Sequence, residues 1–271
     1  MPTIDVRDTK LYYEKTGEGD PALVLIHGMC SASWSWKEQV DRLSRDFTCV
    51  AYDRRGHSRS ELGTRDQSDR THTDDLAVLI ETLELDRPVL VGSSSGGVIA
   101  AEMMRSYPNL VRGAVLMEPA LISLDPQVAR QLESEMIPVL QDAHANGGER
   151  AAVDVFFQMV CGSYWKDLDD ARREQTLANA HLLFPTLERG GGDMTLGDLS
   201  SIDLPTLVIG GSASPPFFHA LNQILVDHLP NARHVQIEDS GHVVLFEQPD
   251  AFARATSAFV HEIAGVRSAA V

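Results

Sequence analysis

Residues 88–107 read PVLVGSSSGGVIAAEMMRSY. The first four residues form an apolar run typical of a strand, and the last ten have the spacing of a helix, so the small residues between them must form a tight turn. Gly92, Ser94 and Gly96 fit the pattern G-x-S-x-G. In such a turn the glycines let strand and helix nearly touch, while the serine is held above the sheet edge in a strained conformation. The pattern predicts a nucleophilic serine at position 94, although five residues alone also fit a plain Gly/Ser loop.

Apolar runs and helical patterns alternate on both sides of this turn. We expect an opening hairpin (3–8 and 11–15), further strands at 22–26, 47–52, 111–117, 204–210 and 234–238, and helices at 34–43, 73–85, 217–229 and 250–263. This alternation predicts an α/β fold with a mostly parallel eight-stranded sheet and right-handed crossovers. Such sheets bind ligands at the carboxyl ends of their strands. His27, Asp53, Ser94 and Glu118 all follow predicted strands at that edge.

The alternation stops between residues 122 and 203, where the pattern is helical, with helices expected at 128–145 and 150–160 and a hinge at Gly190-Gly191-Gly192. This segment is expected to be a helical lid, so the chain divides into core residues 1–121, lid residues 122–203 and core residues 204–271. Its apolar side chains fit either a substrate pocket or the lid's own core. The candidate substrate-binding residues are Gly28, Trp34, Met136, Phe157, Trp165 and Phe217.

Composition limits the possible partners. The chain has 271 residues, with 39 acidic against 23 basic side chains and a formal charge of -16, which would repel nucleic acid and anionic membranes. We expect a small, neutral or weakly charged substrate. No leader pattern and no run of membrane-spanning length is present, which predicts a cytoplasmic protein. The sequence does not decide the oligomeric state, and a homodimer is compatible with it.

The cysteines predict free thiols in a reducing compartment, because there are three of them, widely spaced and without a C-x-x-C pair. Cys30 lies near the proposed site as either a reactive thiol or a small buried filler. No cluster has the spacing of metal ligands, and no phosphate loop or dinucleotide fingerprint occurs, so no metal and no cofactor is expected.

Taken in order, the motifs resemble the α/β-hydrolase superfamily over nearly the whole chain. The matching pieces are His27-Gly28, the loop from Asp53 to Ser58, the G-x-S-x-G turn and Ser240-Gly241-His242. The resemblance implies a hydrolase fold with Ser94 as nucleophile and His242, which comes last in the chain, as base. It also implies that Asp53 is a structural staple of its own loop. The oxyanion donors would be the backbone N–H groups of Met29 and Ser95.

The acid departs from the usual pattern of the superfamily. Relatives commonly carry Asp after the seventh strand, but that turn reads GGSASPP over residues 210–216 and has no carboxylate. Glu118, after the sixth strand, is the expected acid, with a structural carboxylate at the lid hinge as the competing interpretation. Asp239 is the fallback acid. A minority of the superfamily places its acid after strand six, and the zearalenone lactonases among them resemble this chain in also having a serine nucleophile.

The combination predicts a serine hydrolase that cleaves a carboxylic ester or lactone through an acyl-enzyme and a Ser-His-Glu triad. A macrolactone such as zearalenone is one specific substrate candidate. A carbon–carbon bond hydrolase using the same triad is the second enzymatic interpretation, disfavoured by the missing aspartate. A hydrolase-fold receptor that binds a lactone or hormone-like ligand without turnover is the alternative from another class.

Overall fold

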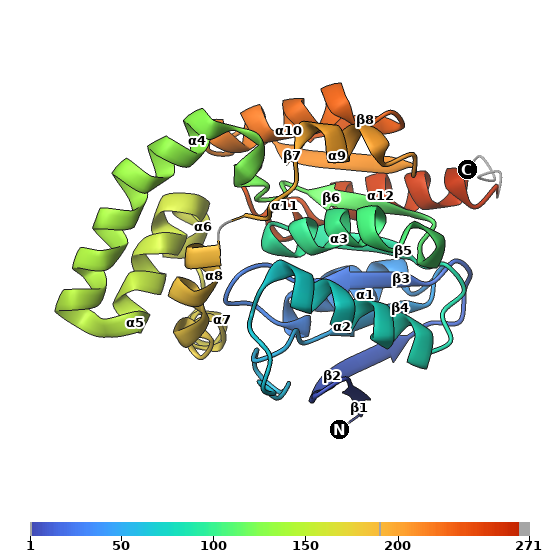
Figure 1. Cartoon of the computed structure of the whole chain (residues 1–271), viewed down its shortest axis with the longest axis horizontal. Helices are drawn as coiled ribbons and strands as arrows, with labels where there is room; N and C mark the ends of the chain where they lie inside the picture. The colour runs from blue at the N-terminus through green and yellow to red at the C-terminus, as the bar shows by residue number, and fades with distance from the viewer. Residues whose placement is uncertain (1, 190, 266–271) are drawn as a thin grey trace.

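A mostly parallel eight-stranded sheet forms the centre of the computed structural model, which describes residues 2–189 and 191–265 (Figure 1). The strand order is β1-β2-β4-β3-β5-β6-β7-β8, with antiparallel pairing only of β1 with β2 and of β2 with β4. The predicted fold class is therefore confirmed. The strands are β1 (Thr3–Val6), β2 (Thr9–Thr16), β3 (Leu23–Ile26), β4 (Cys49–Tyr52), β5 (Val89–Ser93), β6 (Gly113–Met117), β7 (Thr206–Gly211) and β8 (Ala232–Ile237).

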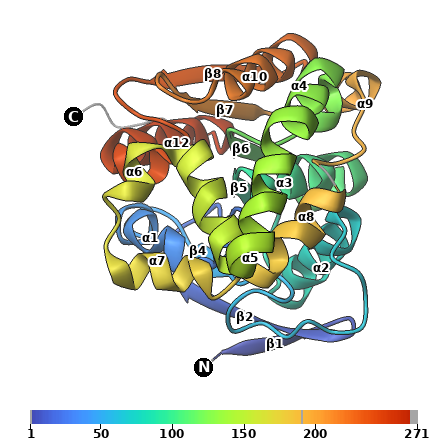
Figure 2. The ribbon, with the colours of Figure 1, turned by 90° about the vertical axis from the view of Figure 1, so that its left-hand side faces the viewer.

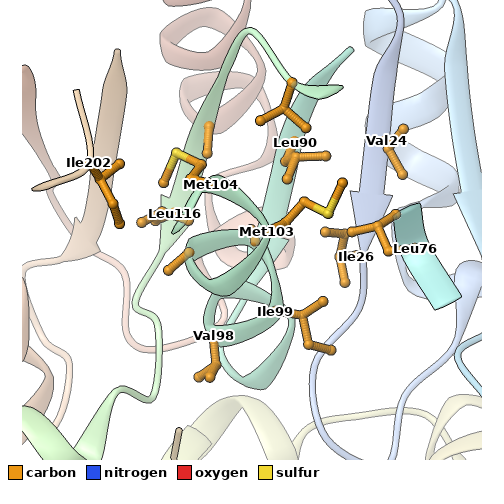
Figure 3. Close-up of a cluster of buried hydrophobic side chains, with 14 of the residues drawn as sticks. Val24, Ile26, Leu76, Leu90, Val98, Ile99, Met103, Met104, Leu116 and Ile202 are labelled. Atoms are coloured by element: carbon orange, nitrogen blue, oxygen red, sulfur yellow. The ribbon is translucent and has the colours of Figure 1, made fainter. Parts of the chain in front are cut away.

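Helices cover both faces of this sheet. The core helices are α1 (Lys37–Leu43), α2 (Asp69–Thr82), α3 (Ser95–Ser106), α10 (Pro216–His228), α11 (Val244–Glu247) and α12 (Pro249–Ile263). Side chains alternate along β3, so Val24 and Ile26 join an apolar cluster with α2 and α3, while Leu23 and Leu25 join one with α1 and α12. Figure 3 shows the first cluster, where α3 packs on one face of the sheet, over β5 and its neighbours β3 and β6. Burial on both faces explains why the parallel strands read as continuous apolar runs.

Most predicted elements are present with shifted ends. The expected helix at 73–85 begins earlier, at Asp69, because Ser68 caps it by accepting the Thr71 N–H. The expected helix at 34–43 opens as a 3-10 turn, Ser33–Trp36, before α1. Both differences lie at helix starts, where a capping side chain or a tighter turn decides the first residue.

Between β6 and β7 the described residues form helices and turns but no strand. In Figure 2 these helices, with α4 and α5 nearest the viewer, lie in front of the sheet. The helices are α4 (Pro126–Gln131), α5 (Ile137–Cys161), α6 (Ser163–Lys166), α7 (Asp170–Leu177), α8 (Leu183–Arg189) and α9 (Leu196–Ser201), with a π-helical stretch at Leu132–Met136. The two helices expected at 128–145 and 150–160 are observed as α4, the π-helical stretch and α5. The helical conformation is interrupted inside α5 at Gly148, whose φ is 75°. Gly190 of the expected hinge lies outside the described residues.

No helix in the described ranges has the length and hydropathy needed to cross a bilayer.

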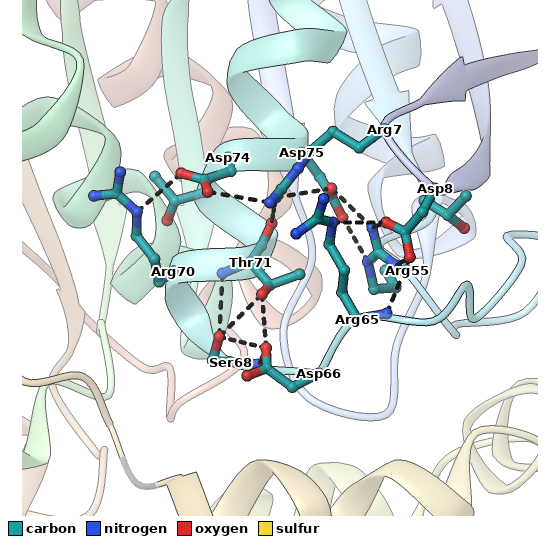
Figure 4. Close-up of polar contacts among 12 residues, drawn as sticks. Arg7, Asp8, Arg55, Arg65, Asp66, Ser68, Arg70, Thr71, Asp74 and Asp75 are labelled. Atoms are coloured by element: carbon teal, nitrogen blue, oxygen red, sulfur yellow. Dashed lines mark hydrogen bonds and ion pairs between the residues drawn. The ribbon is translucent and has the colours of Figure 1, made fainter.

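A buried ion pair ties the loop after β4 to the helix α2 (Figure 4). The Arg55 guanidinium is fully buried and its Nε donates to Asp75 Oδ2 at 2.7 Å. The same guanidinium reaches Asp8, in the β1–β2 turn, with 2.9 Å between Nη2 and Oδ1. One side chain therefore links three segments that are far apart in the chain.

We expect Asp75→Asn to lower the free energy of unfolding by about 3 kcal/mol, because removal of one partner leaves a buried charge uncompensated. Denaturant unfolding followed by circular dichroism measures the loss. Asp74→Asn is the matched control, since the neighbouring Asp74 is partly exposed and its pairing contributes about 1 kcal/mol or less. Equal losses in the two variants would contradict a special role of the buried pair.

Candidate active site

Ser94 lies in the turn between β5 and α3 and has a backbone conformation that is rare for a non-glycine residue, with φ 52° and ψ −119°. The flanking positions must be glycine, because a side chain at either one would clash with neighbouring backbone atoms. A Cβ on Gly96 would lie 2.2 Å from the Ile26 carbonyl oxygen, and one on Gly92 would lie 2.5 Å from the Gly96 carbonyl oxygen. The Ser94 N–H donates to the Met117 carbonyl at 2.9 Å, which ties the turn to the end of β6. The strained serine is thus held by its surroundings.

His242 and Glu118 meet although they are 124 positions apart in the chain. His242 Nδ1 lies 2.7 Å from Glu118 Oε2, and both side chains are buried. Glu118 is an acceptor, so Nδ1 carries the hydrogen and Nε2 is left as the basic nitrogen. The imidazole also stacks on Phe218, with ring centroids 4.0 Å apart and an interplanar angle of 11°. The ring is therefore fixed both in tautomer and in orientation.

The turn after β7, which lacks a carboxylate, supplies hydrogen-bond donors to Glu118 instead. Glu118 Oε1 accepts from the Gly211 N–H at 2.8 Å and from the Ser214 hydroxyl at 2.5 Å. The carboxylate thus has three polar partners, counting His242. Serine at position 214 has a structural reason, because a second carboxylate there would face Glu118 and repel it.

Asp239 lies away from this pair. It is exposed, and within the described residues no hydrogen bond joins its carboxylate to His242. The loop that carries His242 is held by a different acid, Glu247, whose Oε2 accepts the Gly241 N–H at 2.8 Å. Burial raises the pKa of Glu247.

The two backbone donors expected from the sequence flank Ser94. Ser95 is the first residue of α3, so its N–H has no acceptor within the helix. On the other side, a Cβ placed on Gly28 would lie 3.4 Å from Ser94 Cβ, which puts the Gly28–Met29 peptide next to the nucleophile. Met29 and Ser94 line the same cavity. Negative charge that develops on a substrate oxygen there would face the N-terminal end of α3 and the N–H of the Gly28–Met29 peptide.

That cavity, of about 70 Å³, is bordered by Ser94, His242, Gly28 and Met29 on the core side. The Ser94 hydroxyl makes no hydrogen bond to another described side chain, although Ser94 and His242 border the same cavity. The inserted helices supply an aromatic wall, and the expected residues Phe157 and Trp165 lie in it, as Trp34 does from the core side.

Met136 and Phe217 do not border this cavity. Both pack in the apolar cluster behind it, together with Trp165 and Phe218, so the structure does not support their expected contact with substrate. Phe217 touches Phe218, which stacks on His242, with 4.3 Å between the phenyl centroids. Their apolar character was a correct signal of burial, but it could not distinguish the second layer from the wall.

Other wall residues gave little or no signal in the sequence. Arg172 on α7 reaches the cavity, and its Nη2 forms an ion pair with Glu38 Oε1 on α1 at 2.9 Å. Phe246 on α11 lines the cavity and stacks on Tyr164 at 5.5 Å between centroids. Phe246 follows the His242 loop closely, and that proximity is the signal that could have identified it.

Asp53 and Cys30 have structural surroundings. Asp53 is buried and accepts from the Ser33 N–H at 2.8 Å and from Arg59 Nε at 2.8 Å, in agreement with the expected loop staple. Cys30 is fully buried, and burial raises the pKa of its thiol to about 12, so it acts as a small filler. Among the described residues, no three His, Cys, Asp or Glu side chains lie so as to hold a metal ion.

Comparisons with known proteins agree with the observed fold. Residues 21–249 match the family model of the alpha/beta hydrolase fold. A protein of Mycobacterium tuberculosis, provisionally named non-heme bromoperoxidase BpoC, is 31% identical over 253 residues, which cover 89% of this chain and 94% of that protein. The chain spans nearly the full length of this relative, so the similarity includes both halves of the sheet and the inserted helices.

Two solved structures add to the comparison. Est816, described as an N-acyl homoserine lactone degrading enzyme, matches with a TM-score of 0.78 at 25% identity, covering 95% of this chain and 100% of that chain. The enol-lactonase from Burkholderia xenovorans LB400 matches with a TM-score of 0.79 at 22% identity, covering 96% and 99% of the two chains. At that identity the second likeness concerns the fold alone.

Proposed function

Because the chain belongs to the alpha/beta hydrolase fold family and resembles the lactone-degrading enzyme Est816 in structure, we propose that it is a serine hydrolase of carboxylic esters or lactones. The observation that carries this proposal is the buried Glu118–His242 pair at 2.7 Å, beside a cavity that also contains the strained Ser94. A carboxylate, an imidazole and a hydroxyl in this order are what acyl transfer requires.

The reaction follows from the roles of these groups. His242 Nε2 takes the proton of the Ser94 hydroxyl as Oγ attacks the carbonyl carbon, and the carbonyl oxygen becomes an oxyanion. The N–H groups of Met29 and Ser95 donate to that oxyanion, each contributing about 3 to 4 kcal/mol to the transition state. His242 then returns the proton to the leaving alkoxide. Water, deprotonated by the same nitrogen, releases the acid and restores Ser94.

The cavity favours a small, apolar acyl group. Its free volume of about 70 Å³ is bordered mainly by aromatic and aliphatic side chains. Ligand sites for drug-sized molecules usually offer several hundred Å³. A macrolactone of the zearalenone type, the candidate that follows from the resemblance to zearalenone lactonases, would fit only after the inserted helices have moved. We therefore rank short acyl esters and small lactones first.

Residues 122–203 would then act as a lid, with residues 1–121 and 204–271 forming the hydrolase core. The Arg172–Glu38 ion pair joins α7 of the insertion to α1 of the core at the cavity. Arg172 also borders a second depression at the surface, together with Trp34 and Phe246. Substrate would enter from this depression when the ion pair opens.

A substrate panel tests the proposal. Purified protein is assayed with p-nitrophenyl esters of increasing acyl length and with small and large lactones, and Ser94 is labelled with a fluorophosphonate and located by mass spectrometry. We expect steady-state turnover that is highest for short acyl chains, with a single label on Ser94. Labelling without turnover would favour a ligand receptor, and absence of both would refute the proposal. A ring-fission product followed by ultraviolet absorbance tests the carbon–carbon hydrolase alternative.

Similarity to a provisionally named bromoperoxidase makes halide oxidation a second candidate. On the same site it requires hydrogen peroxide in place of water, so that the acyl-enzyme yields a peracid, which oxidises bromide and returns to the carboxylic acid. The panel is repeated with a short-chain carboxylic acid, peroxide, bromide and a brominatable dye. Bromination that disappears in Ser94→Ala would support this route.

A further inference from the structure

Arg54 is a buried cation that forms no ion pair with a described carboxylate, and Asp69 on α2 acts on its charge only at a longer range than an ion pair. It directly follows Asp53 after β4 and is 2% exposed. No carboxylate of the described residues lies within ion-pair distance of its guanidinium, and its Nε has no hydrogen-bond partner. Burial lowers its pKa. A charged group in this position costs stability unless its contacts compensate. The contacts that it does make are therefore informative.

One nitrogen of this guanidinium reaches both sides of the nucleophile. Arg54 Nη2 donates to the Gly28 carbonyl oxygen at 3.0 Å and to the Ser95 hydroxyl oxygen at 3.2 Å. Gly28 and Met29 share a peptide unit, so the carbonyl that accepts from Arg54 belongs to the same peptide as the proposed Met29 donor. Ser95 carries the other proposed donor. The guanidinium thus links the two backbone donors of the oxyanion site.

Two neutral histidines lie beside Arg54, His27 at its backbone and His57 at its guanidinium. The backbone N–H of Arg54 donates to His27 Nε2 at 2.9 Å, which leaves the hydrogen on Nδ1 to donate to the Gly28 carbonyl at 2.9 Å. His57 Nε2 lies 3.3 Å from Arg54 Nη2. Burial, followed by the Arg54 charge, holds the pKa of both imidazoles well below 6.5. Neither ring adds a second positive charge at neutral pH.

We infer that Arg54 is a positioning residue for the oxyanion site. Through its bonds to the Gly28 carbonyl and the Ser95 hydroxyl it orients the two backbone donors and polarises the Gly28–Met29 peptide. Donors on the Gly28 carbonyl polarise the peptide and strengthen its N–H on the opposite side as a donor. A positive charge one peptide away favours negative charge on the substrate oxygen, and in a buried site this effect is weakly screened. The inference rests on the proposed serine hydrolase function.

The competing explanation is a purely structural cross-link between the loop after β3 and helix α3. A structural role would lower stability without a selective loss of transition-state binding. Arg55 offers a matched control, because it is an adjacent arginine, equally buried, whose partners Asp8 and Asp75 lie away from the cavity. It has no part in the oxyanion site.

The test compares wild type, Arg54→Met, Arg54→Lys, Ser95→Ala and the control Arg55→Lys. For each folded protein, kcat and KM are measured on the best ester, together with the affinity for a phenylboronic acid, which forms a tetrahedral adduct on the serine, and the unfolding temperature. We expect Arg54→Met to lower kcat and boronate affinity about 100-fold with little change in KM. Arg54→Lys should fall between it and wild type. Ser95→Ala, which removes one acceptor of Arg54, should lower kcat about threefold or more.

Arg55→Lys should reduce the unfolding temperature and leave kcat unchanged. Unchanged kcat and boronate affinity in Arg54→Lys and Ser95→Ala would overturn the inference, and these two variants carry the test if Arg54→Met does not fold. Losses that follow the unfolding temperature equally in Arg54→Lys and Arg55→Lys would overturn it as well. Wild-type turnover separates the two proposals. If it is absent, the hydrolase function fails and the inference fails with it, whereas activity with insensitive variants refutes the inference alone.

Discussion

Ser94→Ala is expected to lower kcat for ester hydrolysis by about 10⁶-fold, because without the hydroxyl no acyl-enzyme forms. His242 and Glu118 contribute little to the rate once the nucleophile is missing. KM should change little, since the backbone donors and the aromatic wall remain. His242→Ala should cause a loss of similar size. The fluorophosphonate label should disappear in Ser94→Ala. Steady-state assays at substrate saturation, with enzyme purified free of host esterases, measure the effect.

Ser93→Ala is the matched control for this experiment. Ser93 precedes the nucleophile and borders the same cavity, but it ends β5 in ordinary strand conformation. Its replacement should change kcat by less than about tenfold. Comparable losses in the two serine variants would mean that Ser94 acts through packing and not as nucleophile.

Glu118→Gln is expected to lower kcat by about 10⁴-fold while the fold is retained. The amide oxygen can keep the bonds from Gly211 and Ser214, which leaves the amide nitrogen facing His242 Nδ1. Two donors cannot face each other, so the imidazole would move its hydrogen to Nε2. That nitrogen would then be unable to accept the Ser94 proton. The loss comes from the wrong tautomer and from the missing negative charge beside the imidazolium.

Asp239→Asn tests the rival acid in parallel. Because Asp239 is exposed and forms no hydrogen bond with His242 in the described structure, its replacement should leave kcat within about twofold of wild type. Thermal unfolding of both variants shows whether either change acts through stability. Near-normal turnover by Glu118→Gln combined with loss in Asp239→Asn would transfer the acid to Asp239.

Local pattern was a good guide where one element decides its own shape. The turn around Ser94 is encoded within five residues, since only glycine fits at 92 and 96 once strand and helix are this close. The continuous apolar runs predicted buried strands, and the parallel sheet confirms them. The start of α2 was misplaced, because the Ser68 cap is a weaker signal than the apolar stripe that follows it.

The cavity wall was predicted less well. Trp34, Phe157 and Trp165 border the cavity, whereas Met136 and Phe217 pack behind it. Hydrophobicity indicates that a side chain is buried, but the layer to which it belongs depends on how the inserted helices sit on the core. Arg54 was also outside the reach of the sequence, because nothing in a loop motif reveals that its side chain turns inward to Gly28 and Ser95.

The sequence by itself determined the order of strands and helices, the serine turn and the absence of an acid after β7, because periodicity and turn chemistry act over a few neighbouring residues. Only the tertiary structure decided which carboxylate meets His242, since Glu118 and His242 are 124 positions apart and come together through sheet pairing and loop direction. The same holds for the inward path of Arg54. Contacts of this kind depend on the three-dimensional placement of whole elements, which no local pattern encodes.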